Sequence, residues 1–174
     1  MSITLYLGCG PSGCGKSTEL KRRLNETGGV YISRDVVRFN LLKDNEDYFA
    51  KEDEVFNDFC ELIQQAIDEK KSIIYVDATH LNEKGRNKVL NKLNLTDVDI
   101  IPISMNASLK NCLDRNAQRT GRALVPSDVV ANMHRTFQPP TFKEKYKYKE
   151  IIFVNLEDEL DGKNMVNVRL ASSS

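Results

Sequence analysis

Close to its N-terminus the sequence carries a pattern suited to holding phosphate groups. Residues 10–17, Gly-Pro-Ser-Gly-Cys-Gly-Lys-Ser, fit the spacing G-x-x-x-x-G-K-[ST]. Glycines let the backbone curl so that successive N–H groups point inward, and a helix that begins there adds the positive end of its dipole. Lys16 is expected to reach the β- and γ-phosphates, and the Ser17 hydroxyl to ligate Mg²⁺. The predicted site for ATP with Mg²⁺ consists of Gly13, Cys14, Gly15, Lys16, Ser17 and Thr18.

Two weaker interpretations of residues 10–17 stay open. A glycine-rich turn can match the spacing by chance, and a nucleotide sensor binds ATP without turning it over. The flanks favour a working phosphate loop, because a strand-like run at Ile3–Gly8 precedes it and a helical run that ends before Gly28 follows it.

Two aspartates follow short runs that are typical of strands. Asp35 comes after Val30–Ser33, and Asp77 ends the run Ser72–Asp77. Reacting groups collect at the C-terminal ends of parallel strands. Asp35 could orient an acceptor hydroxyl and take its proton, while Arg38, one helical turn later, could bind an acceptor phosphate. An N-capping aspartate with an i,i+3 ion pair is an equally supported alternative.

Asp77 lies where a carboxylate can hold a Mg²⁺-bound water, and it could instead help to bind the acceptor. A plain turn aspartate is the alternative. Thr79 and His80 follow directly and could line the same pocket, although a lone histidine is more often structural.

Three arginines lie late in the chain on a segment that interrupts the helical pattern: Arg115, Arg119 and Arg122. We interpret the region from about 115 to 138 as a lid over ATP. Its arginines would neutralise the charge that develops on the transferred phosphoryl group, and its closure would exclude water. A solvated basic helix end, which the helix dipole favours, is the alternative.

Strand-like and helical segments alternate along the rest of the chain. The further predicted elements are helices near Val36–Leu42, at Glu54–Lys70, Glu83–Leu93 and Leu109–Gln118 and from Pro126, and strands at Val98–Met105 and Ile151–Asn155. Ala171–Ser174 is interpreted as a frayed end. This alternation predicts an α/β fold of three layers, with a central parallel sheet and helices on both faces, as a single domain over residues 1–174.

Composition limits the classes of function. The formal net charge is +0, which disfavours a protein that coats nucleic acid with a broad basic surface. No stretch is apolar over the about 18 residues that a membrane span needs, and no basic leader precedes the first strand, so we expect a cytoplasmic protein. Four cysteines without a C-x-x-C pair, and only two histidines, disfavour zinc and predict free, buried thiols.

Lysines alternate with Glu144, Tyr146 and Tyr148 over residues 143–149. Basic residues between aromatic ones can bind a nucleic-acid strand. A solvated loop before the last strand is the preferred interpretation.

The order of these motifs resembles the kinase domain of phage-type 5′-hydroxyl polynucleotide kinases. The resemblance rests on residues 10–17, Arg34–Arg38, Asp77–Asn82, Arg115–Arg119 and Val125–Val129, and it spans nearly the whole chain. It implies an adenylate-kinase-like fold with a helical arginine lid, and transfer of the γ-phosphate of ATP to the 5′-OH end of RNA or DNA. It also implies a role in nucleic-acid end repair, with an RNA or DNA ligase as a pathway partner.

The resemblance assigns roles residue by residue. Lys16 and Ser17 would bind ATP, and Asp35 would be the general base for the 5′-OH. Arg38 would hold the 3′ phosphate of the terminal nucleotide, Arg119 would contact the ATP phosphates, and Val125 would press on the acceptor base. Members of that family carry a second, phosphatase domain with a D-x-D-G-T motif. The sequence has no such motif, so we expect no 3′-phosphatase activity.

Two alternatives to the polynucleotide kinase share parts of this pattern. A small-molecule kinase for a nucleoside, nucleotide or sugar would also need the phosphate loop, the lid and Asp35, but not an arginine for a 3′ phosphate. A nucleotide-dependent regulatory ATPase would hydrolyse ATP slowly, whatever acceptor is present. The preference for RNA or DNA and the oligomeric state stay open.

Overall fold

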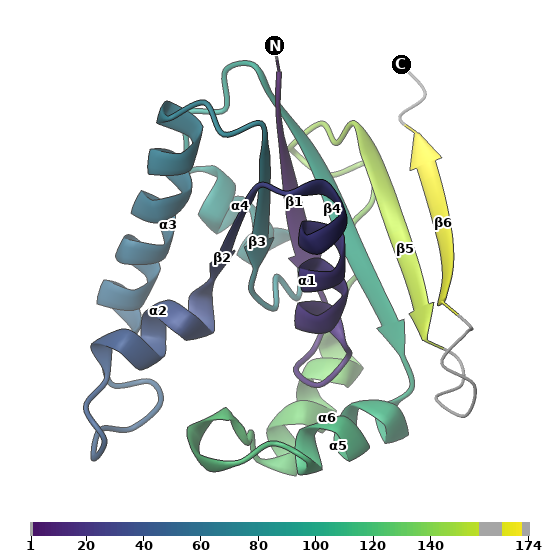
Figure 1. Ribbon diagram of the computed structural model, residues 1–174. Helices are drawn as coiled ribbons and strands as arrows, with labels where there is room; N and C mark the ends of the chain where they lie inside the picture. The colour runs from purple at the N-terminus through teal and green to yellow at the C-terminus, as the bar shows by residue number, and fades with distance from the viewer. Residues whose placement is uncertain (1, 157–164, 172–174) are drawn as a thin grey trace.

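The protein forms one mixed β-sheet flanked by helices (Figure 1). The computed structural model describes residues 2–156 and 165–171. Within that part the sheet has six strands in the order β2-β3-β1-β4-β5-β6. The strands are β1 (Ile3–Cys9), β2 (Val30–Ser33), β3 (Ile73–Asp77), β4 (Val98–Ala107), β5 (Glu150–Leu156) and β6 (Met165–Ala171).

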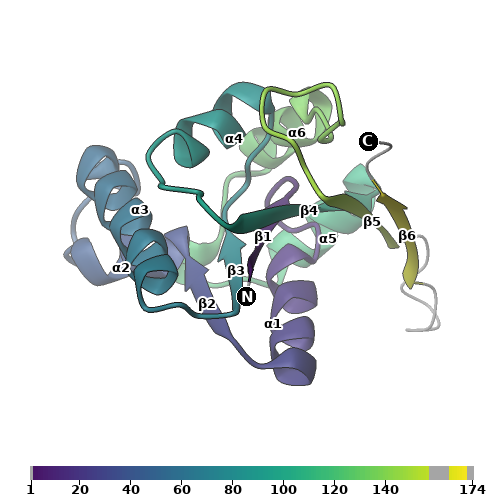
Figure 2. The same cartoon turned by 90° about the horizontal axis from the view of Figure 1, so that it is seen from above.

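Helices cover both faces of the sheet, as the alternating pattern predicted. They are α1 (Lys16–Thr27), α2 (Arg34–Leu41), α3 (Glu52–Asp68), α4 (Glu83–Leu90), α5 (Leu109–Ala117) and α6 (Ser127–Thr136), with a short 3₁₀ turn, η1 (Gly121–Ala123). Seen from above, α1 lies on one side of the sheet and α4 on the other (Figure 2). One buried cluster joins β1 to α3 and α4, and a second joins β4 to α1 and α5. The predicted three-layer α/β fold is confirmed.

The longest helix shows how the apolar pattern places an element. In α3 the side chains of Val55, Phe59, Ile63 and Ile67 recur at helical spacing and are at most 5% exposed. They pack on the sheet, while the charged face points to solvent. In the described part of the chain no helix is long and apolar enough to cross a membrane. All four cysteines are free and buried, as expected.

The edge of the sheet corrects one prediction. Ile151–Asn155 was expected to be the last strand of a parallel sheet, but β6 follows and pairs antiparallel with β5. Val166, Val168 and Leu170 alternate with polar residues in β6, which is the period-2 signal of a strand. Ala171 therefore belongs to β6, and the rest of the expected frayed end, residues 172–174, lies outside the described residues.

Strand register brings the motifs to one edge of the sheet. In the parallel ladders Asp77 of β3 lies opposite both Gly8 of β1 and Ser33 of β2. The phosphate loop follows β1, and α2 follows β2 without a connecting loop. The C-terminal ends of three neighbouring strands thus bring together Asp77, the phosphate loop and the first turn of α2.

A buried arginine ties the back of this edge together. The guanidinium of Arg86 in α4 is 1% exposed and donates two hydrogen bonds, of 2.9 and 2.7 Å, to the carboxylate of Glu144. It also donates to the backbone carbonyls of His80 (2.8 Å) and Gln138 (2.9 Å). Arg86 therefore links the loop after β3 to the segment after α6.

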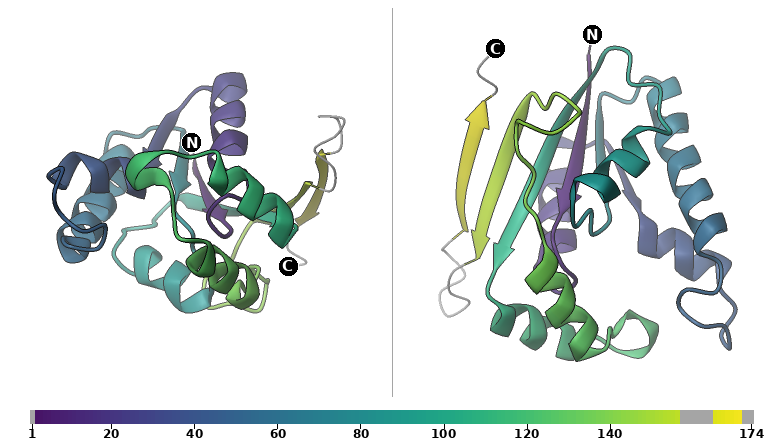
Figure 3. Two further views of the ribbon diagram at one scale, coloured as in Figure 1. Left: turned by 90° about the horizontal axis from the view of Figure 1, so that it is seen from below. Right: turned by 180° about the vertical axis from the view of Figure 1, so that it is seen from behind.

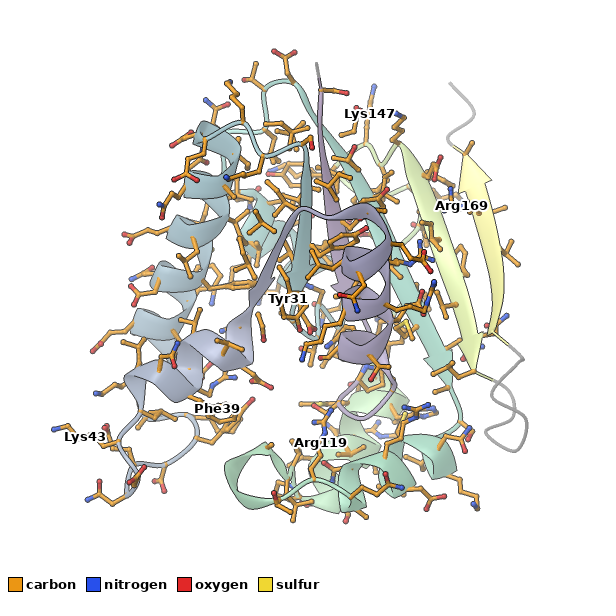
Figure 4. All side chains as sticks on the ribbon, viewed as in Figure 1. Tyr31, Phe39, Lys43, Arg119, Lys147 and Arg169 are labelled. Carbon is orange, nitrogen blue, oxygen red and sulfur yellow. The ribbon has the colours of Figure 1, made fainter. Side chains whose placement is uncertain are left out.

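The same network explains the alternating stretch at residues 143–149. Glu144 and Tyr148 point inward, and the Tyr148 hydroxyl donates to the Glu144 carboxylate at 2.7 Å. Tyr148 is 1% exposed, so its ring is covered and not open to a base. Lys147 lies at the opposite end of the molecule from Arg119 (Figure 4). These positions favour a structural loop at 143–149 over a nucleic-acid surface.

Replacing Arg86 should destabilise the protein strongly. In Arg86→Met the buried carboxylate of Glu144 loses its partner, which costs about 3–5 kcal/mol when one member of a buried ion pair is removed. Urea unfolding would measure the change, with Lys84→Ala as the control, because Lys84 is exposed on the same helix. If the free energy of unfolding fell no more in Arg86→Met than in the control, the stabilising role of Arg86 would be contradicted.

Candidate active site

The phosphate loop is shaped for close approach of its backbone. Gly13 and Gly15 have φ angles of 80° and 83°, which side chains rarely adopt. A Cβ atom at Gly13 would lie 2.4 Å from the Cys112 carbonyl oxygen of α5, so the loop packs against that helix only because the position is glycine. Within the described residues no side chain caps the N-terminus of α1. Its first N–H groups are therefore open to an anion.

A cavity of about 260 Å³ lies over this loop. Among the residues that the structure describes, the charged side chains that line it are the cations Lys16, Arg115 and Arg119. The predicted loop residues Gly13, Cys14, Gly15, Ser17 and Thr18 line the same cavity. Backbone donors, a helix N-terminus and three cations in one concave site fit the phosphates of a nucleotide. We call this the donor cavity.

Three donors meet on the carboxylate of Asp77. The Lys16 ammonium donates to Oδ1 at 2.6 Å, the Ser17 hydroxyl donates to Oδ2 at 2.6 Å, and the Tyr31 hydroxyl donates to Oδ2 as well. A hydroxyl and a carboxylate side by side are the hard oxygen ligands that Mg²⁺ prefers, so this pair fits the predicted metal site. Sequence reasoning missed Tyr31, because nothing in the pattern of β2 indicates which strand neighbour its hydroxyl reaches.

Electrostatics keep the Lys16–Asp77 pair ionised. Burial alone would raise the pKa of Asp77, but the Lys16 charge and the three hydrogen bonds outweigh it and lower that pKa. Burial would likewise lower the pKa of Lys16, and the Asp77 charge raises it. Burial and the charge of Asp77 raise the pKa of Tyr31, so its proton stays in place. The cation is thus fixed at the loop before any nucleotide binds.

A second cavity of about 470 Å³ opens beside the first. All of the residues predicted on the acceptor side line it: Asp35, Arg38, Asp77, Thr79 and Val125. Three residues that also line the donor cavity contribute as well: Lys16, Ser17 and Arg119. We call this the acceptor cavity. The two cavities share Lys16, Ser17 and Arg119. Their junction is where a phosphoryl group held by the loop would face an acceptor.

The carboxylate of Asp35 faces the acceptor cavity from the first turn of α2. Ser33 caps this helix, accepting from the Val36 backbone N–H at 3.3 Å, so the alternative of an N-capping aspartate is wrong. The cap also explains why α2 begins earlier than predicted. The expected i,i+3 ion pair between Asp35 and Arg38 is present. Asp35 remains 51% exposed.

Arg38 is held more tightly than the sequence suggested. Its guanidinium is 4% exposed and donates to Glu52 at 2.9 and 2.7 Å and to the Tyr48 hydroxyl at 2.7 Å. Glu52 also accepts from Arg34 at 3.1 Å. Sequence reasoning missed Tyr48 and Glu52, because it assigned no structure to the loop after α2. On this side of the cavity two arginines are balanced by two carboxylates.

The region predicted to be a lid, from about 115 to 138, contains the end of α5, η1 and α6. The Asn116 side chain donates to the Val125 carbonyl at 2.5 Å and accepts from the Val125 N–H at 3.1 Å. This pairing fixes the loop that carries Val125 to the helix that carries Arg115. Arg119 follows α5 directly and reaches both cavities. The backbone of Arg122 lies in η1, but its side chain falls outside the described residues.

His80 is a buried structural residue, as is more common for a lone histidine. It is 5% exposed with φ of 42°, and its Nδ1 lies 2.6 Å from the Gly8 carbonyl oxygen. Burial lowers its pKa to about 4, the bond to Gly8 opposes this, and the nearby charges are Lys16, Asp77 and Arg34. Thr79, one residue earlier, accepts the Gly10 N–H on its carbonyl at 2.8 Å and so anchors the start of the loop.

Comparison with known proteins identifies related chains. A family described as an AAA domain matches residues 5–140. The L-seryl-tRNA(Sec) kinase of Methanococcus maripaludis is 24% identical over 160 residues, which make up 91% of this chain and 59% of that protein. The chain thus spans less than two thirds of the length of this curated relative.

Solved structures share the fold at low sequence identity. A sugar kinase from Janibacter sp. HTCC2649 has a TM-score of 0.59 at 16% identity, with 90% of this chain and 86% of that chain covered. A chain of the Pnkp1/Rnl/Hen1 RNA repair complex has a TM-score of 0.64 at 15% identity, with 78% of this chain and 44% of that chain covered. The fold is therefore that of P-loop kinases.

Burial of neutral His80 predicts a pH dependence of stability. The pKa falls from 6.5 in the unfolded chain to about 4 in the fold, so below pH 6.5 the unfolded chain binds a proton that the folded chain does not. This stabilisation is complete above pH 6.5 and is lost as the pH falls, by about 2 kcal/mol near pH 5.

Urea unfolding between about pH 7 and about pH 5 tests this, since carboxyl groups take up protons mainly at lower pH. His80→Asn is the comparison, because asparagine tolerates a positive φ and its amide can donate to Gly8. In this variant the free energy of unfolding should no longer fall by the amount due to His80 between about pH 7 and about pH 5. An equal slope in both proteins would contradict the assignment.

Proposed function

This chain belongs to the AAA domain family, and from that premise we propose that it is a polynucleotide 5′-hydroxyl kinase, which transfers the γ-phosphate of ATP to the 5′-OH end of RNA or DNA. The observation that carries the proposal is the junction of the two cavities. Lys16, Ser17 and Arg119 line both cavities, whereas Asp35 lines the acceptor cavity and not the donor cavity. A phosphate site that opens onto a carboxylate suits transfer to an alcohol.

Each side chain at the junction has a task in that reaction. In the described part of the chain both hydrogen bonds to Asp35 reach Oδ1, which leaves Oδ2 to accept the proton of the acceptor hydroxyl. Lys16 and Arg119 neutralise charge on the phosphates, and Ser17 with Asp77 would hold Mg²⁺. Bound ATP with Mg²⁺ supplies the phosphoryl group. Arg119 on its lid segment also helps to exclude water.

Support for a polynucleotide acceptor comes from the order of the motifs and from the names of relatives. One relative is a seryl-tRNA kinase, and one structural neighbour belongs to an RNA repair complex. Within the proposal, Arg38 and Val125 contact the terminal nucleotide, and end repair with an RNA or DNA ligase is the setting. Both relatives are longer than the part that this chain matches.

A small-molecule kinase is the second candidate, and a specific observation favours it. Arg38, the expected phosphate contact, is already neutralised by Asp35 and Glu52. A neutral acceptor such as a sugar or nucleoside needs no free cation there, and a sugar kinase shares the fold. A regulatory ATPase is less supported, because water as the acceptor needs no cavity of about 470 Å³ beside the phosphate loop.

Transfer of labelled γ-phosphate tests the proposal directly. The protein, ATP and Mg²⁺ should label RNA or DNA oligonucleotides that end in a 5′-OH and should leave 5′-phosphorylated ones unlabelled. Label on a free nucleoside or sugar, with none on the oligonucleotides, would reject the polynucleotide acceptor in favour of the second candidate. Slow hydrolysis that no acceptor changes would favour a regulatory ATPase.

Replacing Asp35 should separate chemistry from ATP binding. Asp35→Asn removes the proton acceptor but leaves the donor cavity intact, so we expect transfer to fall by about 10²–10⁴-fold. Single-turnover rates and the affinity for ATP would be measured together. Asp68→Asn is the matched control, since Asp68 is exposed at the far end of α3. Transfer in Asp35→Asn at the control rate would remove Asp35 as the base.

A further inference from the structure

An aromatic ring stands in the wall of the acceptor cavity without cover. Phe49 lies in the loop between α2 and α3, is 64% exposed and lines the cavity. Leu124, just after η1, is 46% exposed and lines the same cavity. The two loops that carry them lie at the same end of the molecule, at the bottom of the right-hand view of Figure 3. Two uncovered apolar side chains from separate segments thus border one opening.

Phe49 is held in place from behind. Its ring packs edge-on against Tyr48, with centroids 4.7 Å apart and planes at 82°. Tyr48 in turn packs edge-on against Phe39 at 6.1 Å, and its ring lies 4.1 Å from the Arg38 guanidinium carbon. These contacts of Tyr48 therefore support the ring of Phe49 from one side. A fixed ring loses little freedom when a ligand stacks on it.

Tyr48 connects this ring surface to the reacting end of the cavity. Its hydroxyl donates to Asp35 Oδ1 at 2.7 Å and accepts from Arg38 at 2.7 Å. The side chain that supports Phe49 therefore also orients the carboxylate of Asp35. Burial, and then the charge of Asp35, raise the pKa of Tyr48, so this hydroxyl keeps its proton.

The charges of the cavity favour recognition of a ring over recognition of a phosphate. Arg34 and Arg38 are paired with Glu52, and Arg38 is paired with Asp35 as well. An added phosphate there would meet two carboxylates. A flat neutral group placed against Phe49 would meet an open apolar face, with Leu124 across the opening.

We infer that Phe49 is the platform on which the base of the acceptor's terminal nucleotide stacks, and that Tyr48 couples this platform to the orientation of Asp35. The inference rests on the proposed function and narrows it, because it makes the base, and not the charge of a neighbouring phosphate, the main element recognised. Base stacking on an aromatic side chain is tolerant of sequence, so each of the bases would serve.

The first experiment compares two acceptors that differ only at the 5′-terminal nucleotide, which carries a base in one and is abasic in the other. The wild-type protein should prefer the base-containing strand in kcat/KM. Phe49→Ala should reduce that value by about 5–150-fold and leave the abasic strand unchanged. Phe49→Tyr should keep the preference. Phe142→Ala is the control, because Phe142 is exposed but lies outside the cavity.

Tyr48→Phe distinguishes support of the ring from orientation of the carboxylate. It keeps the aromatic stack and removes the hydroxyl that reaches Asp35. We expect kcat to fall on both strands while the preference for a base persists. Equal loss on both strands in Phe49→Ala, or an unchanged preference, would overturn the platform. Full kcat in Tyr48→Phe would overturn the coupling.

A binding measurement is independent of turnover. The chain has no tryptophan, so Phe49→Trp introduces a single tryptophan at the platform, whose emission can be excited apart from that of the tyrosines. Without ATP, the base-containing strand should quench its fluorescence and the abasic strand should not. Equal quenching by both would reject the platform. If adenosine quenches, ribose does not, and only free nucleosides are phosphorylated, the platform stands while the polynucleotide acceptor fails. The absence of quenching by any base would overturn the inference.

Discussion

The carboxylate of Asp77 is the point on which the rest of the site depends. It lies opposite Gly8 and Ser33 in the parallel ladders, so the sheet alone sets its position. Lys16, Ser17 and Tyr31 all donate to it. Removing this carboxylate would leave a buried ammonium without a partner, which is among the costliest single changes in a protein. The contacts of Asp77 thus join the phosphate loop, its Lys16 side chain and the strands β2 and β3 into one unit.

The two cavities that meet at this unit differ in charge. Among the described residues, those with charge at the donor cavity are the cations Lys16, Arg115 and Arg119, while the acceptor side pairs Arg34 and Arg38 with Asp35 and Glu52. On the acceptor side the arginines of α2 are therefore neutralised by nearby carboxylates, while Arg115 and Arg119 face the donor cavity. Within the proposed reaction, this contrast favours phosphate at the donor cavity and a neutral group at the acceptor cavity. Arg38 is buried and paired with Asp35 and Glu52, so it also helps to fix the position of the Asp35 carboxylate.

Sequence reasoning located what local chemistry encodes. The loop at residues 10–17 and the strand-terminal Asp77 follow from spacing and from the parallel sheet, and Arg119 follows from a break in periodicity. Tyr31, Tyr48 and Glu52 escaped because their partners are fixed by tertiary contacts between elements. The antiparallel β6 was missed although Val168 and Leu170 alternate with polar residues, since the βαβ pattern led us to extend the parallel sheet to its edge. The buried hydrogen bonds of Arg86 to Glu144 and Gln138 could not be predicted either, because these residues are far apart in the sequence.

Helix α5 joins the two cavities mechanically. Its Cys112 carbonyl lies so close to Gly13 that no side chain fits between them, and its Asn116 side chain pairs with the backbone of Val125 on the acceptor wall. Arg115 belongs to the same helix and Arg119 follows it directly, both beside the donor cavity. A shift of α5 would therefore disturb its contact with the phosphate loop and its pairing with Val125 together. Close packing therefore ties the position of the phosphate loop to that of the acceptor wall.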